Sequence, residues 1–140
     1  MKIFISHARN DTRLARAVSE ELKKSGHVVK SGESVESSSD IQYSIKSILD
    51  ECQAMIVILN PHSYQSHWVK LEVEHALTDD KFKNRLLPVL VGRDFDSSPK
   101  RTPWILTSLR HVTLPNEDDV VSNARKVVKR FQSILGSREL

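Results

Sequence analysis

Residues 54–61 decide the fold of this chain, and their sequence is Ala54-Met55-Ile56-Val57-Ile58-Leu59-Asn60-Pro61. An unbroken apolar run of this length is typical of a strand buried on both faces, as in a parallel sheet. Asn60 and Pro61 supply turn residues directly after it. We therefore predict an interior parallel strand over 54–59. Open α/β sheets hold their ligands beyond the carboxyl ends of such strands.

Apolar runs alternate with amphipathic segments along the rest of the chain, which predicts an α/β fold with a parallel sheet of four to five strands flanked by helices. Strands are expected over 2–6, 28–29, 86–91 and, at an edge, 110–114. Helices are expected over 11–25, 40–52, 67–79 and 117–135, with Gly26 ending the first one. The inward stripe predicted for the last helix is Val120, Val121, Ala124, Val128, Phe131 and Leu135.

The composition is that of an ordinary soluble domain of 140 residues, with 39% hydrophobic and 28% charged residues. We expect a single domain over 1–140. No apolar stretch approaches the roughly 20 residues that span a bilayer, and no signal peptide is visible. Cys52 is the only cysteine, which fits a reducing, cytoplasmic compartment and a small buried hydrophobe. The net charge of +3 comes from Lys and Arg scattered among Asp and Glu, so no nucleic-acid footprint is expected.

Several common sites are absent from the sequence. The four glycines form neither a G-x-G-x-x-G nor a Walker A pattern, and no G-x-S-x-G elbow is present. The histidines have no metal-ligand spacing, so no metal is expected. A glycine-rich phosphate loop and a serine-hydrolase elbow are thus both disfavoured.

The segment Ser66-His67-Trp68-Val69-Lys70-Leu71-Glu72 holds the main candidate residues. On a helix over 67–79, Trp68 and Glu72 lie one turn apart, at the border of the core stripe, whereas Glu74 points away from the core. A carboxylate beside an aromatic wall suits a substrate that becomes cationic as it reacts. The alternative is a surface carboxylate beside a packing tryptophan.

Other candidates lie in loops at the same edge of the predicted sheet. Ser6, His7 and Arg9 follow the first strand, and Arg9 can pair with a phosphate. Glu33 lies in the polar loop over 31–39 and can reach a ribose. The alternatives are a structural histidine, an exposed loop cation and a glutamate with no role.

The ordered set of motifs resembles the Toll/interleukin receptor (TIR) domain family, especially its bacterial members, over about Lys2 to Gly92. The matching residues are Phe4-Ile5-Ser6-His7 with Asn10-Asp11, then Ser39-Asp40-Ile41, then Ile56 to Pro61 with Tyr64, Ser66, Trp68 and Glu72, and finally Leu87-Pro88-Val89-Leu90. The chain departs from the family after the second strand, where Lys30 and Ser31 replace the usual aromatic and acidic residues.

The resemblance implies the TIR fold, a flavodoxin-like sheet, and a choice of function. Many TIR domains cleave NAD+ between nicotinamide and ribose, and release ADP-ribose or a cyclised form; the glutamate they need is matched by Glu72. We therefore expect an NAD+ glycohydrolase or ADP-ribosyl cyclase in bacterial signalling or antiphage defence, with NAD+ as substrate and no cofactor. Trp68, Ser6, His7, Arg9 and Glu33 are the expected substrate-binding residues.

Two other interpretations stay open. Other TIR domains are non-enzymatic adaptors that assemble with their own kind, and self-association is expected in either case. An effector that senses the product is a further expected partner, whereas direct nucleic-acid or membrane binding is not expected. A receiver or flavodoxin-type domain fits less well, because Ser6-His7 and Asn60-Pro61 stand where a receiver needs acids.

Overall fold

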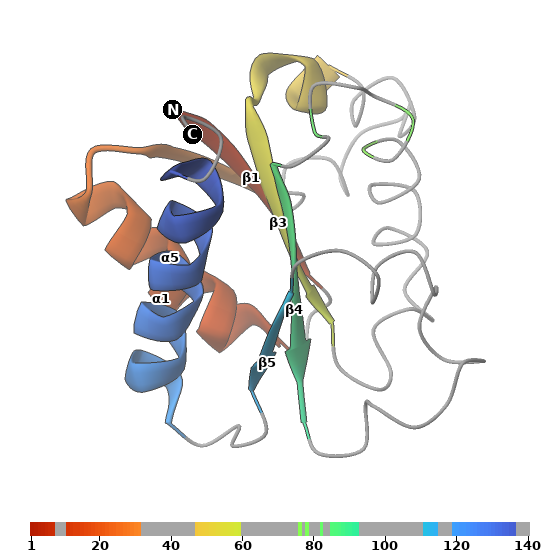
Figure 1. Ribbon diagram of the computed structural model, residues 1–140. Coiled ribbons are helices and arrows are strands. Elements are labelled where there is room, and N and C mark those ends of the chain that lie inside the picture. Colours follow the sequence, from red (N-terminus) through yellow and green to blue (C-terminus); the bar gives the residue numbers. More distant parts are fainter. Residues whose placement is uncertain are drawn as a thin grey trace.

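The computed structural model describes residues 1–7, 11–31, 47–59, 76, 78, 82, 85–92, 111–114 and 119–136. In this part of the chain a single five-stranded sheet is present, in the order β2-β1-β3-β4-β5, and every neighbouring pair is parallel. The strands are β1 (Lys2–His7), β2 (Val28–Ser31), β3 (Ala54–Leu59), β4 (Leu86–Val91) and β5 (Val112–Leu114). Figure 1 shows the strands running in one direction. The predicted open parallel α/β sheet is confirmed.

β3 is the central strand, and all six of its residues are buried. Ile56 lies in register between Ile5 of β1 and Leu87 of β4. β4 is buried along its whole length as well. Because both faces of these strands are covered, continuous apolar runs are what the positions require. The bounds predicted for both strands are confirmed.

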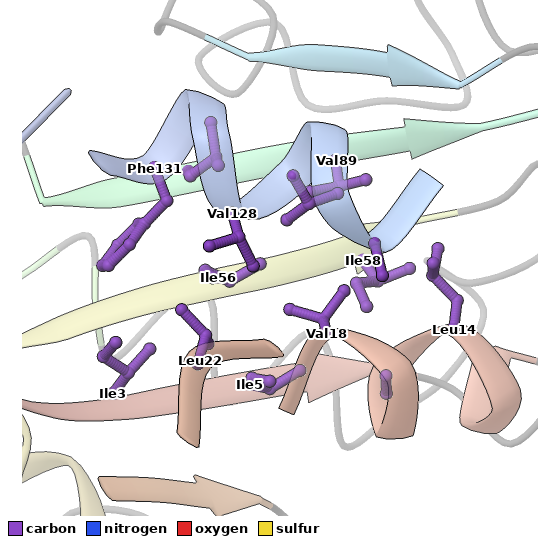
Figure 2. Packing of buried hydrophobic residues seen from close by; sticks show 14 of the residues in the cluster. Ile3, Ile5, Leu14, Val18, Leu22, Ile56, Ile58, Val89, Val128 and Phe131 are labelled. Atoms are coloured by element: carbon purple, nitrogen blue, oxygen red, sulfur yellow. The ribbon is translucent and has the colours of Figure 1, made fainter. Parts of the chain in front are cut away.

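Two helices, α1 (Thr12–Lys24) and α5 (Val120–Gly136), lie side by side over one face of the sheet (Figure 1). Their apolar stripes meet alternate strand residues in one buried cluster. Figure 2 shows its centre, where strand and helix side chains face one another: Ile3, Ile5, Ile56, Ile58, Val89, Leu14, Val18, Leu22, Val128 and Phe131. Each such side chain stabilises the fold by about 1.5–3 kcal/mol through removal from water.

The other face of the sheet is also buried. Phe4, Met55, Val57 and Pro88 alternate with the residues under the helices, and the first three of these have no exposed surface. Leu49 and Cys52, near the end of the predicted helix over 40–52, are 3% and 1% exposed. Residues 47–51 are helical, whereas 40–46 lie outside the described residues. Burial confirms Cys52 as a small core hydrophobe.

Local signals account for the helix ends. After α1, Gly26 has φ 89°, the backbone N–H of Gly26 donates to Lys23 O, and that of His27 donates to Leu22 O. This is the Schellman arrangement that glycine favours, so the predicted stop at Gly26 is confirmed. At the start of α5, the Ser122 N–H donates to Asp119 Oδ1 at 3.1 Å, which makes Asp119 the N-cap.

Several predicted details differ from the structure. β1 ends at His7, β5 begins at Val112 and α5 begins at Val120, each within a few residues of the predicted bounds. β2 continues to Ser31 because the backbones of Lys30 and Ser31 pair with Phe4 and Ile5, which a hydrophobicity pattern does not reveal. Ser31 therefore does not open the polar loop. The inward position predicted for Val121 is wrong, since this residue is 56% exposed.

The buried stripe of α5 explains the error at Val121. The stripe is centred on Ala124, Val127 and Phe131 and includes Ile134, which the prediction omitted. At 100° per residue, Val121 lies roughly a quarter turn from that centre. Its side chain therefore points past the edge of the core.

Candidate functional site

The strand order reverses between β1 and β3. From β1 the chain passes to β2 at one edge and then returns to β3 on the other side of β1. In open α/β sheets, ligands bind beyond the carboxyl ends of the strands at such a switch point. Ser6 and His7 end β1 there, and the register places them opposite Val57 and Ile58 of β3. The two candidates from the first strand thus lie at the expected edge.

Ser6 is completely buried although it is polar. Ile3 and Ile5 belong to the cluster beneath α1 and α5, so strand alternation directs Ser6 to the opposite side of the sheet. The same alternation directs the half-buried His7 toward the side of the two helices. Ser6 and His7 are therefore consecutive residues whose side chains point to opposite faces of the sheet.

Asp11 is a buried carboxylate at this edge that the sequence prediction did not single out as a site residue. It is 7% exposed and directly precedes α1, yet its side chain makes no capping hydrogen bond to the helix. The first turn of α1 carries the positive end of the helix dipole, which favours a negative charge at this position. Because aspartate is polar, the sequence predicts exposure at this position and does not reveal the burial of Asp11.

Four predicted site residues, Arg9, Glu33, Trp68 and Glu72, lie outside the described residues, and their roles stay predictions. Ala76, one helical turn after Glu72 in the sequence, is helical and 2% exposed. This agrees with the predicted core stripe of the helix over 67–79. Thr78 lies in a turn and is exposed, so the predicted end of this helix at residue 79 is wrong.

The described residues contain no group of three or more His, Cys, Asp and Glu side chains arranged to hold a metal ion. Over the same residues, no helix is long and apolar enough to cross a membrane.

The fold and its switch point define the class: a doubly wound, flavodoxin-like α/β domain. The family model for the TIR domain (TIR_2) matches residues 3–128. The chain therefore belongs to the TIR domain family. The match reaches well beyond Gly92, where the motif resemblance becomes weak.

Solved structures agree with this fold. A metazoan TIR-STING receptor from C. gigas, determined in complex with 2',3'-cGAMP, is similar with a TM-score of 0.59 and 25% identity, over 87% of this chain and 38% of the receptor chain. A diflavin flavoprotein from Nostoc sp. is similar with a TM-score of 0.63 and 12% identity, over 99% of this chain and 96% of that chain. At 12% identity, the similarity to the flavoprotein shows a shared flavodoxin-like fold and nothing more. No curated protein matches the chain.

Proposed function

We propose that this TIR domain cleaves NAD+ at the bond between nicotinamide and ribose, with Glu72 as the catalytic carboxylate. The supporting observation is the family match over residues 3–128, since the TIR family includes NAD+-cleaving enzymes. By the motif resemblance, Glu72 matches the glutamate that those members require. The two together favour catalysis over a purely structural glutamate.

The chemistry explains how a single carboxylate suffices. The bond from ribose C1′ to the nicotinamide nitrogen breaks, and its electron pair leaves with nicotinamide as a neutral molecule, so no acid is needed. Positive charge develops on the ribose, and the Glu72 carboxylate stabilises it. Water then adds to C1′ and releases a proton, which gives ADP-ribose. If a nitrogen of the adenine ring adds first, a cyclised product forms.

The sheet topology supports a common location for Ser6 and Glu72. Connections between parallel strands are right-handed, and β3 to β4 runs across the sheet in the direction opposite to β1 to β2. α1 covers one face, so we expect the β3–β4 connection, which contains Glu72, on the other face. Ser6 points to that face at the switch point. Proximity of the two side chains is an expectation of this proposal.

Helix ends favour an anionic substrate at the same edge. α1 follows the carboxyl end of β1, and α5 follows that of β5, so both helices start at this edge of the sheet (Figure 1). Helix N-termini favour anions such as the pyrophosphate of a dinucleotide. Arg9, which lies between β1 and α1 in the sequence, would add a cation for the same group.

The test is nicotinamide release from NAD+, followed by chromatography with mass detection. Glu72→Gln should lower the rate by about 10²–10³-fold, on the scale of one lost electrostatic contact to a transition state. Glu74→Gln is the matched control, because Glu74 is predicted to point away from the core on the same helix; its rate should equal that of the wild type. Equal rates for the wild type and Glu72→Gln would refute the role of Glu72.

The assay should use high protein concentration, because TIR domains typically associate and a neighbouring subunit can complete the substrate site. The mass of the co-product separates ADP-ribose from a cyclised form. We place the reaction in the cytoplasm, in bacterial signalling or antiphage defence, with a separate effector that senses the product.

The second candidate function is a non-enzymatic adaptor. The likeness to the TIR-STING receptor favours it, since that protein is a receptor and this chain spans only 38% of its length. A TIR domain of this kind would act by binding other TIR domains. Assembly seen by light scattering, together with no nicotinamide release from the assembled protein, would support the adaptor and reject the enzyme.

A further inference from the structure

Lys and Arg residues that are far apart in the sequence come together on two neighbouring helices, α1 and α5. α1 and α5 lie more than 90 residues apart in the chain, yet together they hold eight Lys and Arg residues and two glutamates, a net charge of +6. The whole chain has a net charge of +3, so the remaining residues sum to −3. The linear spacing of Lys and Arg, which predicts no nucleic-acid footprint, conceals this asymmetry.

The basic residues of α1 are all on its exposed side. Arg13, Arg16, Lys23 and Lys24 are exposed. Within the described part of the chain, the ion pair made by these helices is Lys24 Nζ to Glu21 Oε1 at 3.5 Å, and the Lys24 side chain is still 73% exposed. An exposed pair of this kind contributes little. Glu20 is exposed among the same cations, so α1 carries a net charge of +2, whereas α5 carries +4.

α5 contains no acidic residue between Val120 and Gly136. Its four cations, Arg125, Lys126, Lys129 and Arg130, are exposed. Arg125 and Lys129 are one helical turn apart, and so are Lys126 and Arg130. Like charges at this spacing repel each other and slightly destabilise the helix. A bound polyanion would relieve that repulsion.

The exposed sides of both helices point away from the sheet together. Val18 and Leu22 of α1 and Val128 and Phe131 of α5 share one cluster over β1, β3 and β4 (Figure 2). The helices lie side by side (Figure 1) with their apolar sides toward the sheet, so the exposed cations of both helices are directed outward from the same face of the sheet. We call the eight exposed cations of α1 and α5 the basic face.

The basic face lacks an apolar centre. In the described part of the chain, the large hydrophobic residues that are exposed are Met1, Val28 and Val121, and only Val121 belongs to either helix. Protein interfaces have an apolar core with aromatic anchors, and membrane-surface helices bury an apolar side. Single-stranded nucleic acids bind largely by stacking on aromatic side chains. Cations alone suffice for the phosphate backbone of a duplex.

We propose that the basic face binds the sugar–phosphate backbone of a nucleic-acid duplex without sequence specificity. The contacts are Lys and Arg side chains to phosphate oxygens, with release of condensed counterions. This binding is separate from the proposed NAD+ chemistry, because the cations of the basic face lie along the outer sides of the helices and Glu72 belongs to another segment.

The experiment measures binding of the full chain to a fluorescein-labelled duplex of about 24 base pairs and mixed sequence, by anisotropy, from 50 to 200 mM salt. A plot of the logarithm of the binding constant against the logarithm of the salt concentration has a slope of about −0.9 for each phosphate contact. Between 1 M and 0.1 M salt, each contact therefore raises the affinity by roughly eightfold. The double variant Lys126→Gln/Lys129→Gln should therefore bind about 60-fold more weakly at 0.1 M salt, with a slope shallower by about 1.8.

Lys30→Glu is the control of equal net-charge change. Lys30 is exposed on β2, in register with Phe4, on the sheet side away from the two helices. The Lys30→Glu variant should bind the duplex with an affinity close to that of the wild type. Circular dichroism of each variant checks the fold.

Three outcomes would overturn the proposal. The first is no binding by the wild type at 50 mM salt and about 100 μM protein. The second is equal weakening by Lys30→Glu, which would mean that overall charge and not the basic face matters. The third is displacement of the duplex by poly-glutamate of matched charge at similar concentration, which would point to an acidic protein partner.

Discussion

Phe131 is one of the largest fully buried side chains, so its removal should cost this fold a large share of its stability. It has no exposed surface and lies in the cluster that joins α5 to the sheet and to α1. Phe→Ala substitutions in well-packed cores cost about 3–5 kcal/mol, from lost transfer free energy and the remaining cavity. A domain of this size is stable by about 5–15 kcal/mol, so Phe131→Ala removes a large share of its stability.

The expected shift in melting temperature follows from the size of the chain. The entropy of unfolding is about 2.1 cal/mol/K per residue, and for 140 residues it sums to about 0.3 kcal/mol/K. A loss of 3–5 kcal/mol therefore lowers Tm by roughly 10–17 °C. Differential scanning calorimetry and urea unfolding both measure this change.

Val121→Ala is the matched control on the same helix. Val121 is 56% exposed, so its truncation should change stability by no more than about 0.5 kcal/mol. Similar losses for the two variants would refute the packing of α5 against the sheet. A loss below about 1 kcal/mol for Phe131→Ala would do the same.

Three further predictions concern local features. Gly26→Ala should lower the free energy of unfolding by about 1–2 kcal/mol through the positive φ of 89° alone, since an added Cβ meets nothing within 4 Å. Gly26→Asn should lower it less, because asparagine tolerates this conformation better. Equal losses for the two variants in urea unfolding would contradict this reason. Asp119→Ala should lower the free energy of unfolding by about 1 kcal/mol, because the Ser122 N–H loses its capping acceptor. Asp119→Asn keeps an acceptor oxygen and should be nearly as stable as the wild type, so equal losses for the two variants would argue against capping. Partial burial, with a further contribution from the N-terminal ammonium, lowers the pKa of His27 below its ordinary value of 6.5, so the unfolded chain binds the proton more readily and stability falls as the pH drops below about 6.5. Tm measured from pH 7.5 to 5 should decline less steeply for His27→Gln, and an unchanged profile would show that other groups dominate.

The buried interior of the sheet could be predicted from the sequence, because hydrophobicity determines it. The runs 54–59 and 86–91 and the stripe Leu14, Val18, Leu22 lie where the pattern placed them. The end of β2 could not be predicted, because Lys30 and Ser31 are held by backbone pairing at a sheet edge. Buried polar residues such as Asp11 and Asn123 were missed for a related reason: their polarity predicts exposure, and only tertiary contacts override it.

The candidate site could be predicted only in part. Ser6 and His7 lie at the predicted edge because the alternation of strands and helices predicts parallel strands, whose carboxyl ends share one edge. The opposite directions of their side chains follow from strand alternation once β1 includes His7, whereas the predicted strand ended at Ser6. The roles of Glu72, Trp68, Arg9 and Glu33 rest on the family resemblance, and the Glu72→Gln variant tests the first of them.

The pairing of α1 with α5 has a consequence for synthesis of the chain. The apolar stripe of α1 is made early, but the helix that lies beside it spans 120–136. While the chain emerges from the ribosome, Leu14, Val18 and Leu22 lack this neighbour, and β1 must wait for β3, some 50 residues later, before it becomes an interior strand. Such non-local pairing makes folding slow and leaves nascent chains open to aggregation. A ribosome-bound chain halted before residue 120 should therefore bind chaperones and resist compaction, whereas one released after residue 136 should not.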